Sequence, residues 1–146
     1  MQVSVITPLF NAEAWIADAI RSLQAQTCPD WELIVVDDQS SDRSLEMVRR
    51  FADTDHRITV LQLEKNSGAA TARNVAIEAA RYRYIAFLDS DDVWLPKKLE
   101  QQIGFMQDRD AALSFTAYEK MDEHGVPYQV MGVPPTVSYA DLLKPM

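Results

Sequence analysis

The chain has 146 residues, enough for one domain with a sizeable core, and its 47% hydrophobic and 25% charged residues are ordinary for a globular protein. A formal net charge of −8 argues against general nucleic-acid binding, which needs a basic surface. The single cysteine excludes an internal disulfide, and neither a membrane-spanning stretch nor a secretory leader is recognisable, so we expect a cytoplasmic or cytoplasm-facing protein.

The first part of the chain alternates short apolar runs with segments in which apolar residues follow helical spacing. We expect a first strand at residues 3–7, ended by Pro8, and then a helix capped by Asn11. Further strands are expected at residues 31–36, 58–63 and 84–88, the last one buried on both faces. Four strand–helix pairs in succession predict a Rossmann-like α/β fold with a mainly parallel sheet flanked by helices.

Each expected helix shows one apolar face. The third helix begins at Gly68 and consists largely of small residues, and Pro96 fits the first position of the fourth. The expected packing residues are Ile16, Ala19, Ile20 and Leu23, then Leu45, Val48 and Ala52, then Ala72, Val75, Ala76 and Ala79, and finally Leu99, Ile103 and Met106.

The pattern changes after residue 110. We expect a strand at residues 112–116, a turn at 122–125 and a second strand at 126–130 that pairs back as a hairpin. A short helix is expected after Ser138. No repeat or low-complexity linker interrupts the chain, so the sequence predicts a single domain over residues 1–146.

Three carboxylates follow the fourth expected strand, at Asp89, Asp91 and Asp92. They lie just past the carboxyl end of a strand, where open α/β sheets place their ligands. Acids this close repel one another unless water screens them or a cation neutralises them. From these residues alone, a divalent metal site and a solvated acidic loop are about equally good interpretations.

The sequence contains no glycine-rich phosphate loop. Pro8 and Phe10 follow the first strand where such a loop would need glycines, and no Gly-Lys-Ser/Thr occurs. A bound nucleotide would therefore need a metal and a cation to neutralise its phosphates. Arg73 and Asn74 lie near the start of the third helix, whose positive end also favours an anion.

Four motifs together resemble family 2 glycosyltransferases of the GT-A fold. They are VITPLFN at residues 5–11, LIVVDDQSSD at 33–42, NSGAATARN at 66–74 and FLDSDD at 87–92. Each motif alone is weak, but four in this order and at this spacing are highly specific. The resemblance covers nearly the whole chain and is strong as far as Met106.

The resemblance implies a site for a nucleotide-sugar donor. It places Pro8 and Phe10 beside the nucleobase, Asp38 as an acceptor of a hydrogen bond from the base, commonly uracil, and Arg73 near the base and phosphates. Residues 89–92 match the so-called DxD motif, which implies that Asp89 and Asp91 contact the donor. For Asp37 we expect a structural role in ordering its own loop.

The same resemblance implies a Mn²⁺ or Mg²⁺ ion held by Asp91 and Asp92 that bridges the diphosphate. The implied activity is metal-dependent, inverting transfer of a sugar from a nucleotide-sugar, commonly a UDP-sugar, to a saccharide or lipid-linked acceptor.

Inverting members use a carboxylate base from a later segment to deprotonate the acceptor hydroxyl. No late acid lies in a motif that matches this base; the late acids are Asp108, Asp110, Glu119, Asp122, Glu123 and Asp141. We therefore expect the donor-binding part of a longer enzyme, without its acceptor-binding part and catalytic base. The C-terminal part that this chain lacks would associate with the inner face of the membrane. The apolar surface that it would otherwise cover would favour self-association of this chain.

Two alternatives remain. The first alternative to an active enzyme is a non-catalytic fragment that binds a nucleotide-sugar. The second is a Mg²⁺-binding module like a phospho-receiver domain. A receiver needs acids at the ends of the first and third strands, whereas here acids follow the second and fourth.

Overall fold

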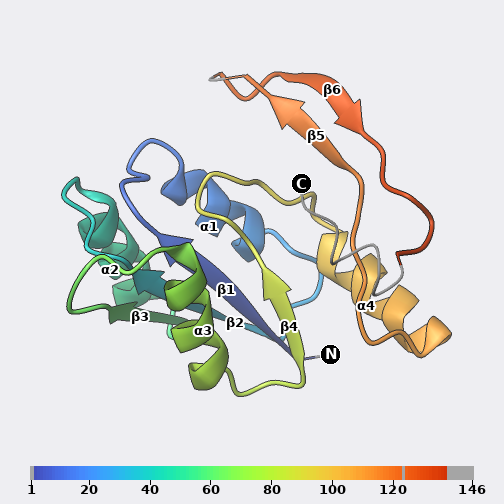
Figure 1. The fold of residues 1–146 in the computed structure, drawn as a ribbon, viewed down its shortest axis with the longest axis horizontal. Helices are drawn as coiled ribbons and strands as arrows, with labels where there is room; N and C mark the ends of the chain where they lie inside the picture. The colour runs from blue at the N-terminus through green and yellow to red at the C-terminus, as the bar shows by residue number, and fades with distance from the viewer. Residues whose placement is uncertain (1, 123, 138–146) are drawn as a thin grey trace. The chain divides into compact units, whose positions relative to one another are not determined.

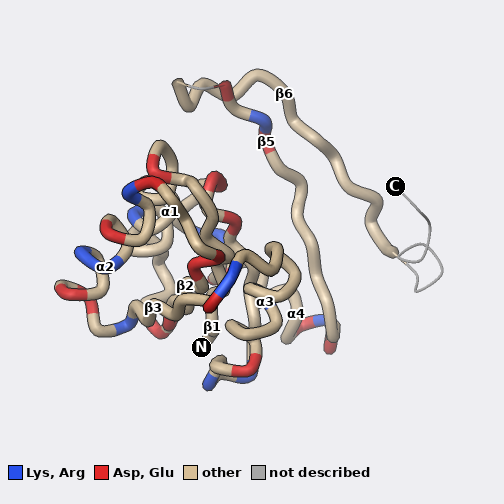
Figure 2. The backbone as a smooth tube through the Cα atoms, turned by 60° about the vertical axis from the view of Figure 1, so that its left-hand side comes forward, with Lys and Arg blue, Asp and Glu red and all other residues tan. Residues whose placement is uncertain are grey.

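The computed structural model describes residues 2–122 and 124–137. The chain forms two compact units, residues 1–103 and residues 104–146. The sequence-based expectation of a single domain is kept as a prediction. Lys and Arg are interspersed with Asp and Glu along the first unit (Figure 2).

The first unit is built on a parallel sheet of four strands (Figure 1). Its strands are β1 (Val3–Leu9), β2 (Trp31–Asp37), β3 (Ile58–Gln62) and β4 (Tyr84–Phe87), in the order β3-β2-β1-β4. Val3 is in register with Trp31 on one side and with Tyr84 on the other. The predicted parallel α/β sheet is confirmed.

Helices cover both faces of this sheet. The connections contain α1 (Ile16–Gln24), α2 (Ser44–Thr54) and α3 (Ala69–Ala79), and α4 (Lys98–Arg109) follows β4. One buried cluster joins residues of α1, α2 and the first turns of α4 to one face, and a second joins α3 to the other. β1 and β2 are buried on both faces and are mostly apolar, and the polar Ser4 and Glu32 within them are buried and joined by a hydrogen bond of 2.6 Å.

The small residues of α3 allow it to approach the sheet closely. Ala72 and Ala76 are fully buried against Ile6, Ile34 and Val36. The predicted packing face is therefore confirmed at these two positions and at Val75, which is partly buried against the same cluster, whereas Ala79, in the last turn, is exposed.

The prediction for the end of β1 is wrong. Pro8 does not end the strand, which continues to Leu9. The Ile6 carbonyl accepts from Leu88 N–H, so Ile6 and, two residues on, Pro8 face the β4 side, where β4 has already ended at Phe87. The missing N–H of proline therefore falls at the point where the pairing between β1 and β4 stops.

The starts of α1 and α4 also differ from expectation. Asn11 has a left-handed backbone, with φ of 48°, and does not cap α1, which begins five residues later at Ile16. Pro96 lies two residues before the first residue of α4, Lys98. In both cases an irregular turn separates the loop from the helix.

The prediction that the fourth strand is buried on both faces is also wrong. Within the described part of the chain, β4 pairs only with β1 and forms an edge of the sheet. Ile85 and Phe87 on one of its faces are 39% and 50% exposed.

The second unit contains an antiparallel hairpin of β5 (Tyr118–Met121) and β6 (Pro127–Met131). The hairpin prediction is confirmed, but residues 112–116 form no strand, and the first strand begins at Tyr118 instead. The helix expected after Ser138 lies outside the described residues. Among the helices of residues 2–122 and 124–137, none has the length and apolar character needed to span a membrane.

Candidate functional site

A cavity of about 320 Å³ opens at the carboxyl ends of the strands, where motif residues from four segments meet. α1 and α3 lie on opposite faces of the sheet, so the β1–β4 edge of the cavity is the switch point at which α/β sheets bind ligands. Its lining consists of Pro8, Leu9, Phe10, Asp38, Asn66, Gly68, Ala69, Arg73, Asp89, Ser90 and Asp91. The structure thus brings together every predicted site residue except Asp92, and Asn74 does not line the cavity either.

Asp38 fixes the start of α3. Its carboxylate is only 3% exposed and accepts hydrogen bonds from the backbone N–H groups of Ser67, at 2.6 Å, and Gly68, at 2.8 Å. Gly68 has φ of 85°, a left-handed conformation that glycine adopts without a steric penalty. Asn66 Nδ2 also donates to the Asp38 carbonyl at 3.0 Å. One acid therefore orders the turn that directs α3 toward the cavity.

Asp37, the neighbouring acid, points into its own loop. It is fully buried, accepts from Gln62 Nε2 at 3.0 Å and from Ser40 N–H at 3.2 Å, and does not line the cavity. The interpretation of Asp37 as a loop-ordering acid is confirmed.

Arg73 supplies the cation predicted at this site. It lies in the second turn of α3, and its Nη2 is 2.5 Å from Asp89 Oδ1. Both side chains are partly exposed, so this pair contributes little to stability but sets a positive group beside the acids at the cavity wall.

The acids of residues 89–92 repel one another. Burial, and then the neighbouring charges of Asp91 and Asp89, raise the pKa of Asp92, an effect that Lys98 partly offsets. Lys98 Nζ lies 3.9 Å from the centre of the Trp94 ring, and burial lowers its pKa to about 8 despite the charge of Asp92. A cation at this loop would relieve the repulsion.

The protein supplies only part of a metal coordination sphere. The residues that the structure describes include no group of three or more His, Cys, Asp or Glu side chains that could hold an ion. Asp89 and Asp91 nevertheless present carboxylate oxygens to the cavity, the ligand type that Mg²⁺ and Mn²⁺ prefer. These residues would suit a divalent cation only where other oxygen ligands completed its coordination.

Sequence reasoning missed several wall residues. Asn66, Ala69 and Ser90 line the cavity but carry no chemistry that marks them in advance. The available signal was their position within the same motifs as Gly68 and Asp89.

Comparison with known proteins agrees with this geometry. The sequence profile of the family described as "Glycosyl transferase family 2" matches residues 4–141. The chain therefore belongs to glycosyltransferase family 2, and its fold is of the GT-A type that the sequence predicted.

Several relatives carry functional names. TuaG of Bacillus subtilis, a glycosyltransferase assigned to teichuronic acid biosynthesis, is 48% identical over 97% of this chain and 57% of its own length. The Escherichia coli protein WfgD, named UDP-Glc:α-D-GlcNAc-diphosphoundecaprenol β-1,3-glucosyltransferase, is 42% identical over 97% of this chain and 55% of its own. The chain thus spans little more than half the length of these relatives.

Solved structures share the fold. Staphylococcus aureus TarS (residues 1–349) in complex with UDP-GlcNAc superposes with a TM-score of 0.70 and 30% identity, over 83% of this chain and 40% of that one. The Pyrobaculum calidifontis mannosyltransferase PcManGT, in complex with GDP-Man and Mn²⁺, has a TM-score of 0.67 and 26% identity, over 80% and 34%.

Proposed function

We propose that this chain is the donor-binding part of an inverting glycosyltransferase that uses a nucleotide-sugar, most simply a UDP-sugar, and a saccharide or lipid-linked acceptor. The observation that carries the proposal is the cavity itself, in which an aromatic ring, a buried carboxylate, an arginine and two acids converge from four motifs. Family membership supports it, because its relatives and structural neighbours are named for nucleotide-sugar chemistry.

For the base, we propose recognition by Phe10 and Pro8 together with Asp38. A carboxylate is a pure acceptor with about four lone-pair positions, so the two backbone hydrogen bonds to Asp38 leave room for an imide N–H of uracil. TarS and WfgD are named with UDP donors and PcManGT with GDP-Man, so uridine is the first choice and guanosine the second.

For the phosphates, we propose that Asp91, with Asp92 next to it, binds Mn²⁺ or Mg²⁺ together with the diphosphate. When bound, such an ion stabilises the charge that develops on the leaving nucleoside diphosphate. Arg73 adds a positive group, and Asp89 holds its guanidinium in place through the 2.5 Å contact. Asp92 does not line the cavity, so its proposed role is that of a second, less direct ligand.

The lack of an identified base for the acceptor hydroxyl in the described part of the chain supports the alternative that this chain binds the donor without catalysing transfer. Deprotonation of an acceptor hydroxyl requires a positioned base, which typically contributes about 10²–10⁴-fold to the rate. Of the late acids, Asp108, Asp110, Glu119 and Asp122 do not line the cavity. Glu123 and Asp141 lie outside the described residues.

The receiver-like alternative has no such support, because β1 and β3 end in Leu9 and Gln62 rather than in acids. Membrane association at the inner face and self-association stay part of the proposal. The exposed edge and apolar face of β4 would favour self-association.

The deciding experiment has a binding arm and a transfer arm. Calorimetry of the purified chain with UDP and GDP, in Mn²⁺ and in EDTA, should show metal-dependent binding that favours UDP. Incubation with UDP-sugars, Mn²⁺ and a panel of saccharide and lipid-linked acceptors should show at most slow donor hydrolysis. Absence of nucleotide binding would refute the proposal, whereas efficient transfer would show that a base exists within residues 1–146.

A further inference from the structure

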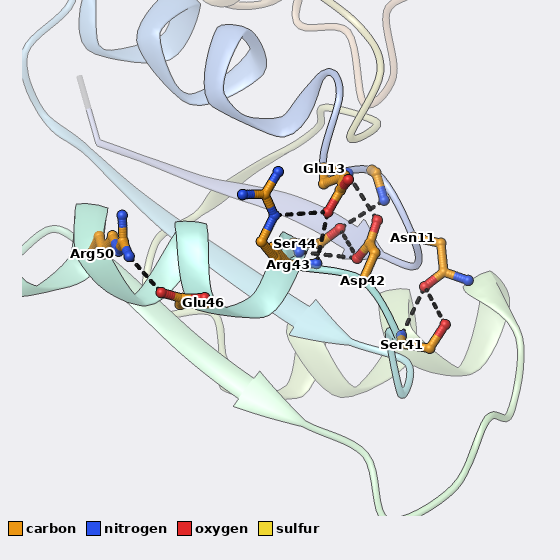
Figure 3. Close-up of polar contacts among 9 residues, drawn as sticks. Asn11, Glu13, Ser41, Asp42, Arg43, Ser44, Glu46 and Arg50 are labelled. Carbon is orange, nitrogen blue, oxygen red and sulfur yellow. Dashed lines mark hydrogen bonds and ion pairs between the residues drawn. The ribbon is translucent and has the colours of Figure 1, made fainter.

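The segments that follow β1 and β2 are joined by hydrogen bonds beside the cavity (Figure 3). Asn11 Oδ1 accepts from the backbone N–H of Ser41 at 2.8 Å and from its hydroxyl at 3.3 Å. In the opposite direction, the backbone N–H of Asn11 donates to Ser40 Oγ at 3.1 Å. We call these bonds, together with those of Asp42 and Ser44, the loop clasp.

The Asp42 half of the loop clasp is firmly built. Asp42 accepts from the backbone N–H and the hydroxyl of Ser44 and, at 3.0 Å, from the backbone N–H of Glu13. The buried Ser44 Oγ in turn accepts from Ala12 N–H at 2.8 Å. Burial opposes ionisation of Asp42, but these hydrogen bonds outweigh it and lower the pKa of the carboxyl. The start of α2 therefore provides a fixed base for the segment after β1.

The Asn11 half is different because it lies at the surface. Its backbone is left-handed, a conformation that Asn tolerates better than most residues. Water can replace the exposed hydrogen bonds of its side chain, so they contribute little to global stability. Their effect is to restrict where the chain runs directly after Phe10.

Phe10 is the residue whose position depends on that restriction. Its ring lines the cavity and is 51% exposed, so little packing holds it. Its backbone is fixed on one side by Leu9, whose carbonyl accepts from Asp38 N–H at 2.8 Å, and on the other side by the clasp at Asn11.

We propose that Asn11 is a positioning residue for nucleotide binding: its clasp to Ser41 holds Phe10 at the cavity wall so that the ring meets the nucleobase. This inference rests on the proposed function, since it needs a nucleobase in the cavity. Asn11 itself touches no ligand and acts only through Phe10. Without the Asn11–Ser41 bonds, part of the binding free energy is spent on ordering Phe10 and Asn11.

The test is a double-mutant cycle on UDP affinity, measured by calorimetry in Mn²⁺ with the full chain. Asn11→Gly keeps the positive φ and removes the acceptor, and Asn11→Asp keeps both. We expect Asn11→Gly to weaken UDP binding by about three- to ten-fold, Asn11→Asp to restore it to within about two-fold, and Asn11→Gly to add less than about two-fold in a Phe10→Ala background.

Asp110→Gly is the matched control, because Asp110 has the same φ of 48° and is not one of the residues that line the cavity. It should leave UDP affinity unchanged. Additive effects of Asn11→Gly and Phe10→Ala, or no rescue by Asn11→Asp, would overturn the inference while leaving the proposed function standing. Failure of the wild-type chain to bind any nucleoside diphosphate would remove both. Thermal unfolding of each variant shows whether a loss of affinity follows a loss of fold.

Discussion

Replacing Asp38 by Asn tests how the start of α3 is held. The carboxylate accepts two backbone N–H groups while almost fully buried, and hydrogen bonds to charged groups contribute about 1.5–3 kcal/mol each. Asn has a single acceptor oxygen, so its NH₂ must face one of the two N–H groups. One bond is therefore lost and the other loses its charge.

We expect Asp38→Asn to lower the free energy of unfolding by about 2–4 kcal/mol. For a chain of this size that corresponds to a fall in Tm of roughly 5–10 °C. Urea denaturation followed by circular dichroism measures the first quantity, and calorimetry measures the second. Asp53→Asn, the same chemical change at an exposed position of α2, should stay within about 0.5 kcal/mol of wild type. An equally small change for Asp38→Asn would refute the reasoning.

The same variant separates two roles of Asp38 in ligand binding. If Asp38 only directs α3 and Arg73, Asp38→Asn should weaken UDP and CDP by the same factor. If it also accepts from the uracil imide, the ratio of the two affinities should change by about five-fold or more, because uracil loses a buried acceptor for its N3–H whereas cytosine carries no hydrogen at N3.

Asp91→Asn should weaken UDP binding in Mn²⁺ by roughly ten-fold or more, and EDTA should remove the difference from wild type, since a charged metal contact is lost; calorimetry that shows equal affinities would exclude Asp91 as a ligand. Gly68→Ala should cost about 1–2 kcal/mol of unfolding free energy, because an L residue is strained at φ of 85° although no atom would obstruct its Cβ. Gly104→Ala, in the helical interior of α4 and equally unobstructed, should instead stabilise by about 0.5–1 kcal/mol. Burial opposes ionisation of Glu32, but hydrogen bonds from Ser4 and Arg81 outweigh it and lower its pKa below 4.5. The stability this supplies is present above pH 4.5 and lost as pH falls through the folded-state value, so Glu32→Gln should flatten the acid limb of unfolding free energy against pH.

The elements of the sheet were predictable because local pattern decided them. The strands Trp31–Asp37 and Ile58–Gln62 differ from expectation by one residue at most, since both lie between turn residues. Six of the seven predicted site residues also come together at one cavity, because parallel strands bring their carboxyl ends to one edge and so collect motifs far apart in sequence.

The predictions that failed concerned features that tertiary structure decides. Whether a proline ends a strand depends on the pairing on both sides of it, and β1 continues through Pro8 because its pairing with β2 persists where its pairing with β4 has stopped. The apolar run of β4 indicated burial on both faces, but its place at an edge was set by strand order. Asp38 also holds the turn at the start of α3 by accepting a hydrogen bond from Ser67, which lies 29 residues away in sequence. No local sequence pattern reveals such a contact.

The central place of β1 has a consequence for how the chain folds during synthesis. Val3 pairs with Trp31 and with Tyr84, so β1 receives its second neighbour only after about 80 more residues have been added. At about 5–20 residues per second, translation leaves one side of β1 without its partner for roughly 4–16 s. During that interval the unpaired backbone edge of β1 can bind wrong partners. Chaperones that bind nascent strands during synthesis should therefore raise the yield of native protein more than a lower temperature applied after synthesis.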